Sequence, residues 1–207
     1  MNTKKALFYL LSTLLLSFGI DFSASAQKFE GGLLAGLSAS QVAGDTYSGY
    51  DKAGIFAGGY VSLPLSNRLD IRLELDYIQK GSRKNPKPEL EDYDSYLMRL
   101  GYVEMPLLFR YKVGTKLLAE AGPAMSFLLH SREKFNQVDV NYHQFKKQNL
   151  SIIIGMSYPV TERISAGLRT NNSLISIRKD RVTGDVWRFF DYGQFNDVLV
   201  LTFGYKL

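Results

Sequence analysis

The clearest pattern in the chain is a strict alternation of apolar and polar positions over LDIRLELDYIQKG, residues 69–81. Leu69, Ile71, Leu73, Leu75 and Tyr77 hold every second position, and most residues between them are charged. A period of two predicts a β-strand with one apolar and one polar face. In a soluble protein the polar face meets water, whereas in an outer-membrane barrel the apolar face meets lipid and the charges fill the interior. The alternation alone leaves both interpretations open.

Similar alternating segments recur along the chain, and no stretch has the pattern of a long amphipathic helix. They predict eight strands, at about residues 28–40, 53–64, 69–80, 99–112, 116–129, 148–158, 163–174 and 197–207. Most of them provide the 9–11 residues or so that a tilted strand needs to cross a bilayer.

The connections between these strands alternate between short and long. Three are tight, at residues 64–68, 113–115 and 159–163, and four are long and polar, at about 41–52, 81–98, 130–147 and 175–196. This arrangement places all short turns at one end of the molecule and all long loops at the other. We therefore predict an all-β fold, an eight-stranded antiparallel up-and-down transmembrane β-barrel with short periplasmic turns and long surface loops.

Three features of the strands favour lipid on the apolar face. Aromatic residues of that face gather near the strand ends, as in interfacial girdles, and glycines lie on the polar face, where a narrow lumen needs room. Charges of both signs also lie on the polar face, and buried charges must be paired. We expect a structural charge network in the lumen, made of Glu30, Asp70, Arg72, Glu74, Glu104, Arg110, Glu120, Arg163, Arg169 and Lys206.

Two prolines interrupt the pattern, Pro106 in the fourth strand and Pro123 in the fifth. Each lacks the N–H that a ladder bond requires. Folding the hairpin about Gly114 places Pro106 opposite about residue 122, which predicts one local β-bulge at the two prolines.

The N-terminus predicts export. Lys4 and Lys5 precede an apolar run, and Ala24 and Ala26 hold the small positions of a cleavage site, so residues 1–26 are expected to be a secretory signal peptide and residues 27–207 the outer-membrane β-barrel domain. The chain has no cysteine, which excludes disulfides and a lipid-modified cysteine. The net charge of +5 comes without a nucleic-acid motif, so no nucleic acid is expected as a partner.

Several segments also resemble a known family. GGLLAGLSAS (31–40), ELDYIQKG (74–81), VEMPLL (103–108) and EAGP (120–123) are similar, in order and in register with the predicted strands, to the PorT-type outer-membrane β-barrel proteins. The resemblance implies an eight-stranded barrel in the outer membrane of a Gram-negative bacterium. It implies little about activity: the name comes from a member linked to protein secretion across the outer membrane, and a secretion role here would rest on fold analogy.

The leading functional hypothesis is a small non-enzymatic barrel that serves as an envelope scaffold, a surface-interaction protein or a secretion accessory. Its expected partners are outer-membrane lipid and an envelope or secretion-system protein. The long loops hold aromatic residues suited to contact with a partner: Tyr93, Tyr96, Trp187, Phe189, Phe190 and Tyr192. These rings could instead fold back on the barrel rim.

Three alternatives remain open at this stage. The first is a small pore for passive transport, although eight strands leave no wide channel. The second is a rim enzyme using the loop with His130, His143, Ser131 and Asp139, for which these groups must converge in space. The third is a soluble lipocalin-like periplasmic barrel, with the two faces exchanged. No motif indicates a metal ion or another cofactor.

Overall fold

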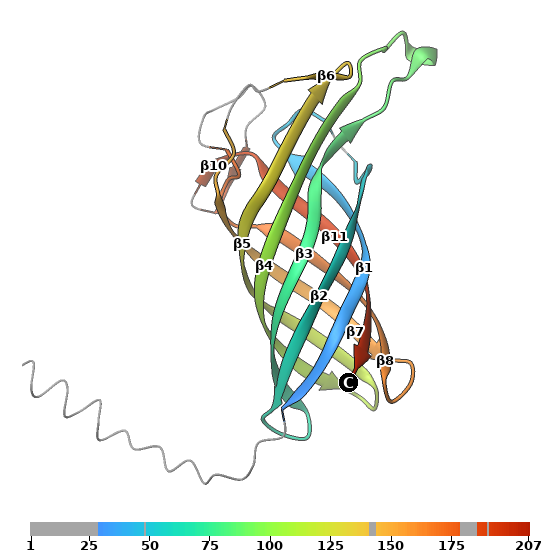
Figure 1. Cartoon of the computed structure of the whole chain (residues 1–207), viewed down its shortest axis with the longest axis vertical. Helices are drawn as coiled ribbons and strands as arrows, with labels where there is room; N and C mark the ends of the chain where they lie inside the picture. The colour runs from blue at the N-terminus through green and yellow to red at the C-terminus, as the bar shows by residue number, and fades with distance from the viewer. Residues whose placement is uncertain (1–28, 48, 141–143, 179–185, 190) are drawn as a thin grey trace, which may run out of the picture.

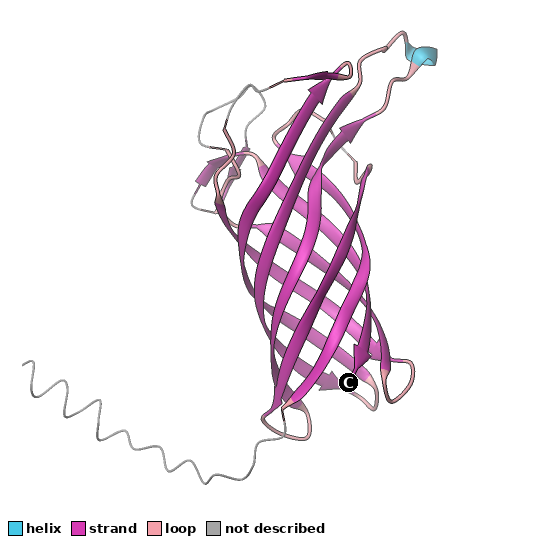
Figure 2. Ribbon diagram, viewed as in Figure 1, coloured by secondary structure: helices cyan, strands magenta, loops and turns pink. Residues whose placement is uncertain are grey.

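A computed structural model describes residues 29–47, 49–140, 144–178, 186–189 and 191–207. Eight long antiparallel strands form the body of the molecule (Figures 1 and 2): β1 (Glu30–Ala43), β2 (Lys52–Pro64), β3 (Leu69–Lys84), β4 (Tyr96–Val113), β5 (Leu117–Phe135), β7 (Gln148–Pro159), β8 (Ile164–Ser173) and β11 (Phe195–Lys206). They follow one another in the order β4-β3-β2-β1-β11-β8-β7-β5, and β5 pairs back with β4. The sheet is therefore closed, and the predicted eight-stranded barrel is confirmed.

The two ends of the barrel differ. The three short turns lie at the end where the C-terminus is found, and the long connections lie at the other (Figure 1). The long connections hold the small elements: the 3₁₀ turn η1 (Pro88–Leu90) and the short strands β6 (Val138–Asp139), β9 (Val186–Arg188) and β10 (Asp191–Gly193). No helix among the described residues is long and apolar enough to cross a membrane.

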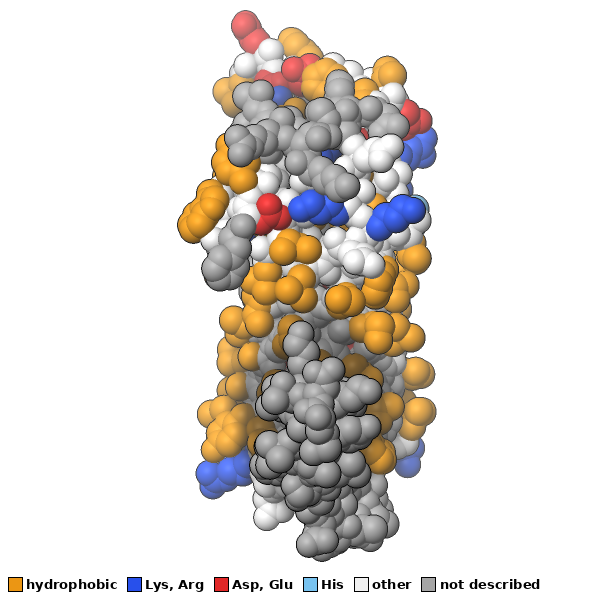
Figure 3. Space-filling view, turned by 90° about the vertical axis from the view of Figure 1, so that its left-hand side faces the viewer, with side chains coloured by type: hydrophobic (Ala, Val, Ile, Leu, Met, Phe, Trp, Pro, Cys, Tyr) orange, Lys and Arg blue, Asp and Glu red, His pale blue; other side chains and the backbone are white. Residues whose placement is uncertain are grey.

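The alternation along β3 separates an outer face from a lumen. Leu73 and Leu75 are 50% and 59% exposed on the outer wall, whereas Glu74 between them is 1% exposed. On the face seen in Figure 3, apolar side chains cover the visible lower part of the barrel, and Lys and Arg side chains lie at the edges of this area. Exposed apolar side chains around a buried charged interior are the reverse of a soluble barrel.

The lumen is filled rather than hollow. Buried apolar side chains pack together in its loop-end half, among them Phe56, Ile78, Leu100 and Val200, and buried charged side chains lie at several levels from the short-turn half to the loop end. Glycine makes this filling possible, because a Cβ on Gly155 would lie only 2.6 Å from the Cβ of Arg169.

The barrel rim is uneven. β4 and β5 contain 18 and 19 residues, whereas β7 and β8 contain 12 and 10. The extra length of β4 and β5, together with the end of β3, rises above the loop end on one side (Figure 1). The expected loop at 81–98 is correspondingly shorter, because β3 continues to Lys84 and β4 begins at Tyr96.

The irregularity in the β4–β5 hairpin lies elsewhere than predicted. Pro106 pairs with Ala124, and the register is unchanged across both prolines. The shift occurs between Gly101 and Tyr102, where Leu129 is the extra residue. The predicted proline bulge is wrong, because Pro123 faces outward and the missing N–H groups leave gaps in the ladder without changing the register.

Candidate functional site

The centre of the lumen is a buried ion-pair cluster around Glu74 of β3. Arg169 of β8 approaches it with Nη1 2.7 Å from Glu74 Oε2, and the Arg169 Nε lies 3.1 Å from Glu120 Oε1. Arg72 Nη1 lies 3.8 Å from Glu74, and its guanidinium lies 3.7 Å from the centroid of the Tyr60 ring. The side chains of Glu74, Glu120 and Arg169 are at most 3% exposed. The cluster joins β3, β5 and β8 across the barrel.

A second cluster lies nearer the loops and is built around Glu104. Lys80 Nζ lies 2.6 Å from Glu104 Oε1, and Asn171 Nδ2 donates to Glu104 Oε2 over 2.8 Å. Ser126 donates a further short hydrogen bond to Glu104. Lys80 is missing from the lumen residues predicted from the sequence. Its polar position in the alternation of residues 69–81 was a signal that could have identified it.

The remaining expected lumen charges lie toward the short turns. Arg110 Nε lies 3.1 Å from Asp70 Oδ1, and Lys206 Nζ lies 2.6 Å from Glu30 Oε1 at the half-exposed lower rim. Arg163 does not lie in the lumen. It is exposed in the turn before β8, where alternation no longer sets side-chain direction, and its Nη1 lies 3.4 Å from the Tyr205 hydroxyl.

A buried contact between β5 and the segment after β8 lies at the loop end of the barrel. Arg178 Nη2 lies 2.6 Å from Glu133 Oε1, and the guanidinium lies 4.4 Å from the centroid of the Phe145 ring. Tyr96 donates its hydroxyl to the same Glu133 and packs on Tyr47, with 4.7 Å between ring centroids. The expectation that Tyr96 lies on a surface loop is wrong, because β4 begins at this residue and turns its side chain inward.

Other predicted loop aromatics are exposed at the loop end. Tyr93 and Trp187 are each 71% exposed, Phe189 is 52% exposed and Tyr192 is 42% exposed. Trp187 of β9 pairs directly with Tyr192 of β10 in a small hairpin. Phe190 lies outside the described residues. We call Tyr93, Trp187, Phe189 and Tyr192 the loop aromatics.

Polar contacts hold the β9–β10 hairpin against the barrel. Arg188 forms a bidentate pair with Asp197 of β11, over 2.6 and 2.8 Å. Asp191 accepts hydrogen bonds from the Ser176 amide and hydroxyl, each at 2.8 Å, and from Lys146 Nζ at 3.1 Å. Burial opposes ionisation of Asp191, but these donors outweigh it and lower the pKa to about 2. Charged groups therefore help to hold the hairpin against the barrel.

The described residues do not assemble a catalytic triad at the histidine loop. His130 is exposed on the outer wall, where its ring lies 6.3 Å from the Tyr77 ring. Ser131 lies on the opposite face of β5, and Asp139 is held by Arg132 at 2.9 Å. His143, like the expected signal peptide at 1–26, lies outside the described residues. No group of three or more His, Cys, Asp or Glu side chains placed to hold a metal ion occurs in the described ranges.

Comparison with known proteins agrees with this geometry. The profile of a family described as outer membrane protein beta-barrel domain matches residues 19–179. Among solved structures, Neisserial surface protein A (NspA) is similar with a TM-score of 0.56 and 13% identity, over 86% of this chain and 97% of that one. No curated protein matches the chain.

Two further barrels show weaker similarity. Ail, the attachment invasion locus protein of Yersinia pestis, has a TM-score of 0.46 and 11% identity, over 87% of this chain and 99% of that one. OprG from Pseudomonas aeruginosa has a TM-score of 0.38 and 13% identity, over 86% and 94%. The likeness to NspA supports the fold alone.

Proposed function

The chain belongs to the outer membrane protein beta-barrel domain family, and from that premise we propose that it is a surface-binding protein whose barrel serves as a closed anchor. It is a small β-barrel of the outer membrane of a Gram-negative bacterium. Its binding surface in this proposal is the set of loop aromatics. Function in such folds lies in the site and not in the barrel itself.

The observation that carries the proposal is the filled lumen. Glu74, Arg169 and Glu120 form a nearly fully buried cluster across the barrel, and Glu104 with Lys80 forms another above it. Apolar side chains fill the space nearer the loops. An eight-stranded barrel has room only for side chains, so this arrangement favours an anchor over a passive pore.

The loop aromatics supply the second part of the argument. Aromatic residues are enriched where proteins bind partners, and the loop end presents several exposed rings, with Tyr93 and Trp187 each 71% exposed. The hairpin that presents Trp187 is fixed by the Arg188–Asp197 pair. A surface positioned in this way loses less conformational entropy when a partner binds.

The test is photo-crosslinking in whole cells. A photoreactive amino acid at Trp187 or Tyr93 is expected to give a discrete crosslinked product, because both side chains project from the loop end. The matched control is the same amino acid at Leu107, an exposed position on the outer wall. Identical products from all three positions, or none from either loop position, would contradict the proposal.

A more specific role follows from the resemblance to PorT-type proteins, namely that the bound partner is part of a secretion system. Deleting the gene would then change the set of secreted proteins. A strain with an unchanged secreted proteome and unchanged surface display would remove this role and leave the surface-binding proposal standing.

A further inference from the structure

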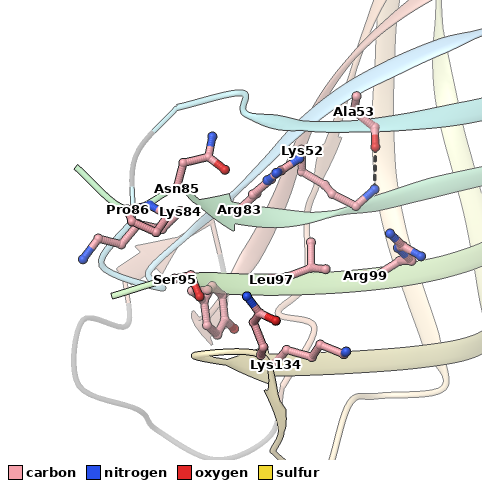
Figure 4. A pocket seen from close by; sticks show the side chains of 12 residues that line it. Lys52, Ala53, Arg83, Lys84, Asn85, Pro86, Ser95, Leu97, Arg99 and Lys134 are labelled. Carbon is pink, nitrogen blue, oxygen red and sulfur yellow. Dashed lines mark hydrogen bonds between the residues drawn. The ribbon is translucent and has the colours of Figure 1, made fainter. Parts of the chain in front are cut away.

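The loop end of the barrel carries a cationic cleft, beside the start of β2 and the extended ends of β3, β4 and β5, that is separate from the loop aromatics. It has a volume of about 530 Å³ and is lined by Lys52 of β2, Arg83 of β3, Arg99 of β4 and Lys134 of β5 (Figure 4). Lys84 also lines it and is paired with Asp92 at 2.8 Å. None of the lining residues is acidic. Besides Lys84, each of four neighbouring strands thus contributes one cation to the lining of the cleft.

The strand register places this cleft above the apolar band. The last paired row of apolar outward residues is Tyr77, Val103 and Phe127, across β3, β4 and β5. Four residues further along β4 lies Arg99, about 13 Å along the strand. Beyond this row the outward side chains include Arg83 on β3, Arg99 on β4, and Arg132 and Lys134 on β5, with Leu97 of β4 between Arg83 and Lys134. The cleft therefore lies above the acyl chains, with Lys134 about 23 Å along β5 from Phe127.

The cleft cations differ from other cations at the loop end. Arg132, Lys146, Arg178 and Arg188 all have a carboxylate within 3.1 Å. Among the described residues, no carboxylate lies within 4.0 Å of a charged nitrogen of Lys52, Arg83, Arg99 or Lys134. Arg99 also lies directly opposite Arg132 in the β4–β5 ladder, which is unfavourable for like charges. The cleft is a concentration of positive charge that the described part of the chain does not neutralise.

Lys52 shows that the cleft is more than a group of exposed lysines and arginines. Its side chain is buried, with the residue 3% exposed, and its Nζ donates to the adjacent Ala53 carbonyl over 2.6 Å (Figure 4). One carbonyl satisfies one of the three ammonium donors. A buried ammonium without a counter-charge is costly, and an anion in the cleft would remove that cost.

We propose that the cationic cleft binds a phosphate group, supplied by a phosphorylated lipid headgroup of the outer leaflet or by free phosphate. Guanidinium and ammonium groups together match a phosphate, since the first gives paired N–H donors and the second a compact charge. Arg99 is the cation of the cleft nearest the apolar band, so a lipid phosphate would enter from that side, whereas free phosphate would enter from the surrounding water. The site is independent of the loop aromatics, so failure of either proposal leaves the other untouched.

The test uses the purified full-length mature protein, folded in a non-ionic detergent and titrated calorimetrically with dihexanoyl phosphatidic acid. The triple variant Arg83→Gln, Arg99→Gln, Lys134→Gln is expected to bind at least tenfold more weakly. Raising NaCl from 50 to 300 mM should weaken wild-type binding several-fold, because the contacts are charged. Retained heat-modifiable mobility on gels shows that each variant is folded.

The matched control removes the same amount of charge at the other rim: Arg68→Gln, Lys112→Gln, Lys116→Gln, all exposed in the structure. Its affinity is expected to stay within twofold of wild type. Equal losses in both triple variants would show general electrostatic attraction and overturn the proposal. Inorganic phosphate that binds as tightly as the lipid would overturn the lipid source. A heparin oligosaccharide that binds when phosphatidic acid does not would assign the cleft to an acidic glycan instead.

Discussion

At the scale of single residues, Glu74 is the junction of the lumen. It contacts Arg169 at 2.7 Å and Arg72 at 3.8 Å, and its side chain is fully buried. Removing one partner of a buried pair leaves a charge without compensation, which costs far more than losing an exposed pair. The charged residues of the lumen therefore contribute unequally to stability, and the more deeply buried ones are expected to contribute more.

This ranking predicts the effect of Glu74→Gln. We expect the free energy of unfolding to fall by about 3 kcal/mol, since Arg169 loses its shortest ion pair and, among the described residues, keeps the one with Glu120. The matched control is Glu30→Gln at the half-exposed rim, where less than about 1 kcal/mol should be lost. Urea unfolding of the barrel in lipid vesicles measures both, and equal effects would mean that the central cluster has no special weight.

The direction of side chains on β3 gives a second prediction. Leu73→Arg places a cation on the outer wall within the apolar band and is expected to destabilise the barrel by about 2–4 kcal/mol if the site lies near mid-bilayer. Gln79→Arg, two rows above Leu75 and beyond the band, should cost about 1 kcal/mol or less. The same vesicle measurement compares them. A Leu73→Arg barrel as stable as wild type would show that this face does not contact lipid.

A third residue carries a pH dependence at the loop end. Burial raises the pKa of Asp45 to about 6, against the hydrogen bonds from Ser82 and the Tyr47 amide that favour its ionised form. The folded state therefore takes up a proton between pH 6 and 4 that the unfolded chain does not, so stability rises as pH falls through 6. The gain is at most about 3 kcal/mol.

Urea unfolding of the barrel in lipid vesicles at pH 7.5 and pH 5 measures this effect. The free energy of unfolding should increase toward pH 5 in the wild type. In Asp45→Asn this increase should be largely lost. An unchanged pH profile in the variant would assign the effect to another group.

At the scale of elements, the β9–β10 hairpin is held against the barrel by the polar contacts of Arg188 and Asp191. Arg188→Gln removes the bidentate pair with Asp197, and we expect faster hydrogen exchange in β9 and β10 with unchanged exchange in the barrel strands. Trp187→Ala is the matched control in the same hairpin. It should leave exchange unchanged, because that side chain is exposed. Equal acceleration in the two variants would show that the ring, too, holds the hairpin.

The elements also show which features the sequence could predict. Period-two alternation predicted all eight barrel strands. A one-residue error in strand register would turn every leucine of a strand such as β3 inward, so the pattern restricts the register strongly. The extension of β4 to Tyr96 and of β5 to Phe135 was not predictable in this way. Above the membrane neither face meets lipid, so the alternation of apolar and polar residues weakens there. The bulge at Leu129 lies in the same region.

The candidate site, like the fold, was predictable from the sequence only in part. Polar positions within strands gave most of the lumen charges, but Arg163 lies in a turn, where no alternation applies. The cationic cleft had no local signal, because its members come from four strands separated by up to 82 residues between Lys52 and Lys134. Only the register brings Arg83, Arg99 and Lys134 to one place.

At the scale of the whole molecule, the filled lumen predicts that the barrel does not conduct ions. Purified protein in planar bilayers is expected to give no stable conductance steps, because buried ion pairs and apolar side chains occupy successive levels of the barrel. A large barrel reconstituted in the same way serves as the positive control. Reproducible single-channel steps that disappear in the unfolded preparation would contradict the anchor proposal.

The uneven rim has a consequence for encounters at the cell surface. β5 continues eight residues past Phe127, the last apolar row, which is about 26 Å along the strand. Headgroups extend only about 5–8 Å beyond the hydrocarbon on each side, so the tip stands clear of them. Because only one side of the barrel is raised, the two sides of the molecule differ in how a partner can approach them. A large partner can contact the raised side while it is still distant from the bilayer, whereas it must be at the lipid surface to contact the low side.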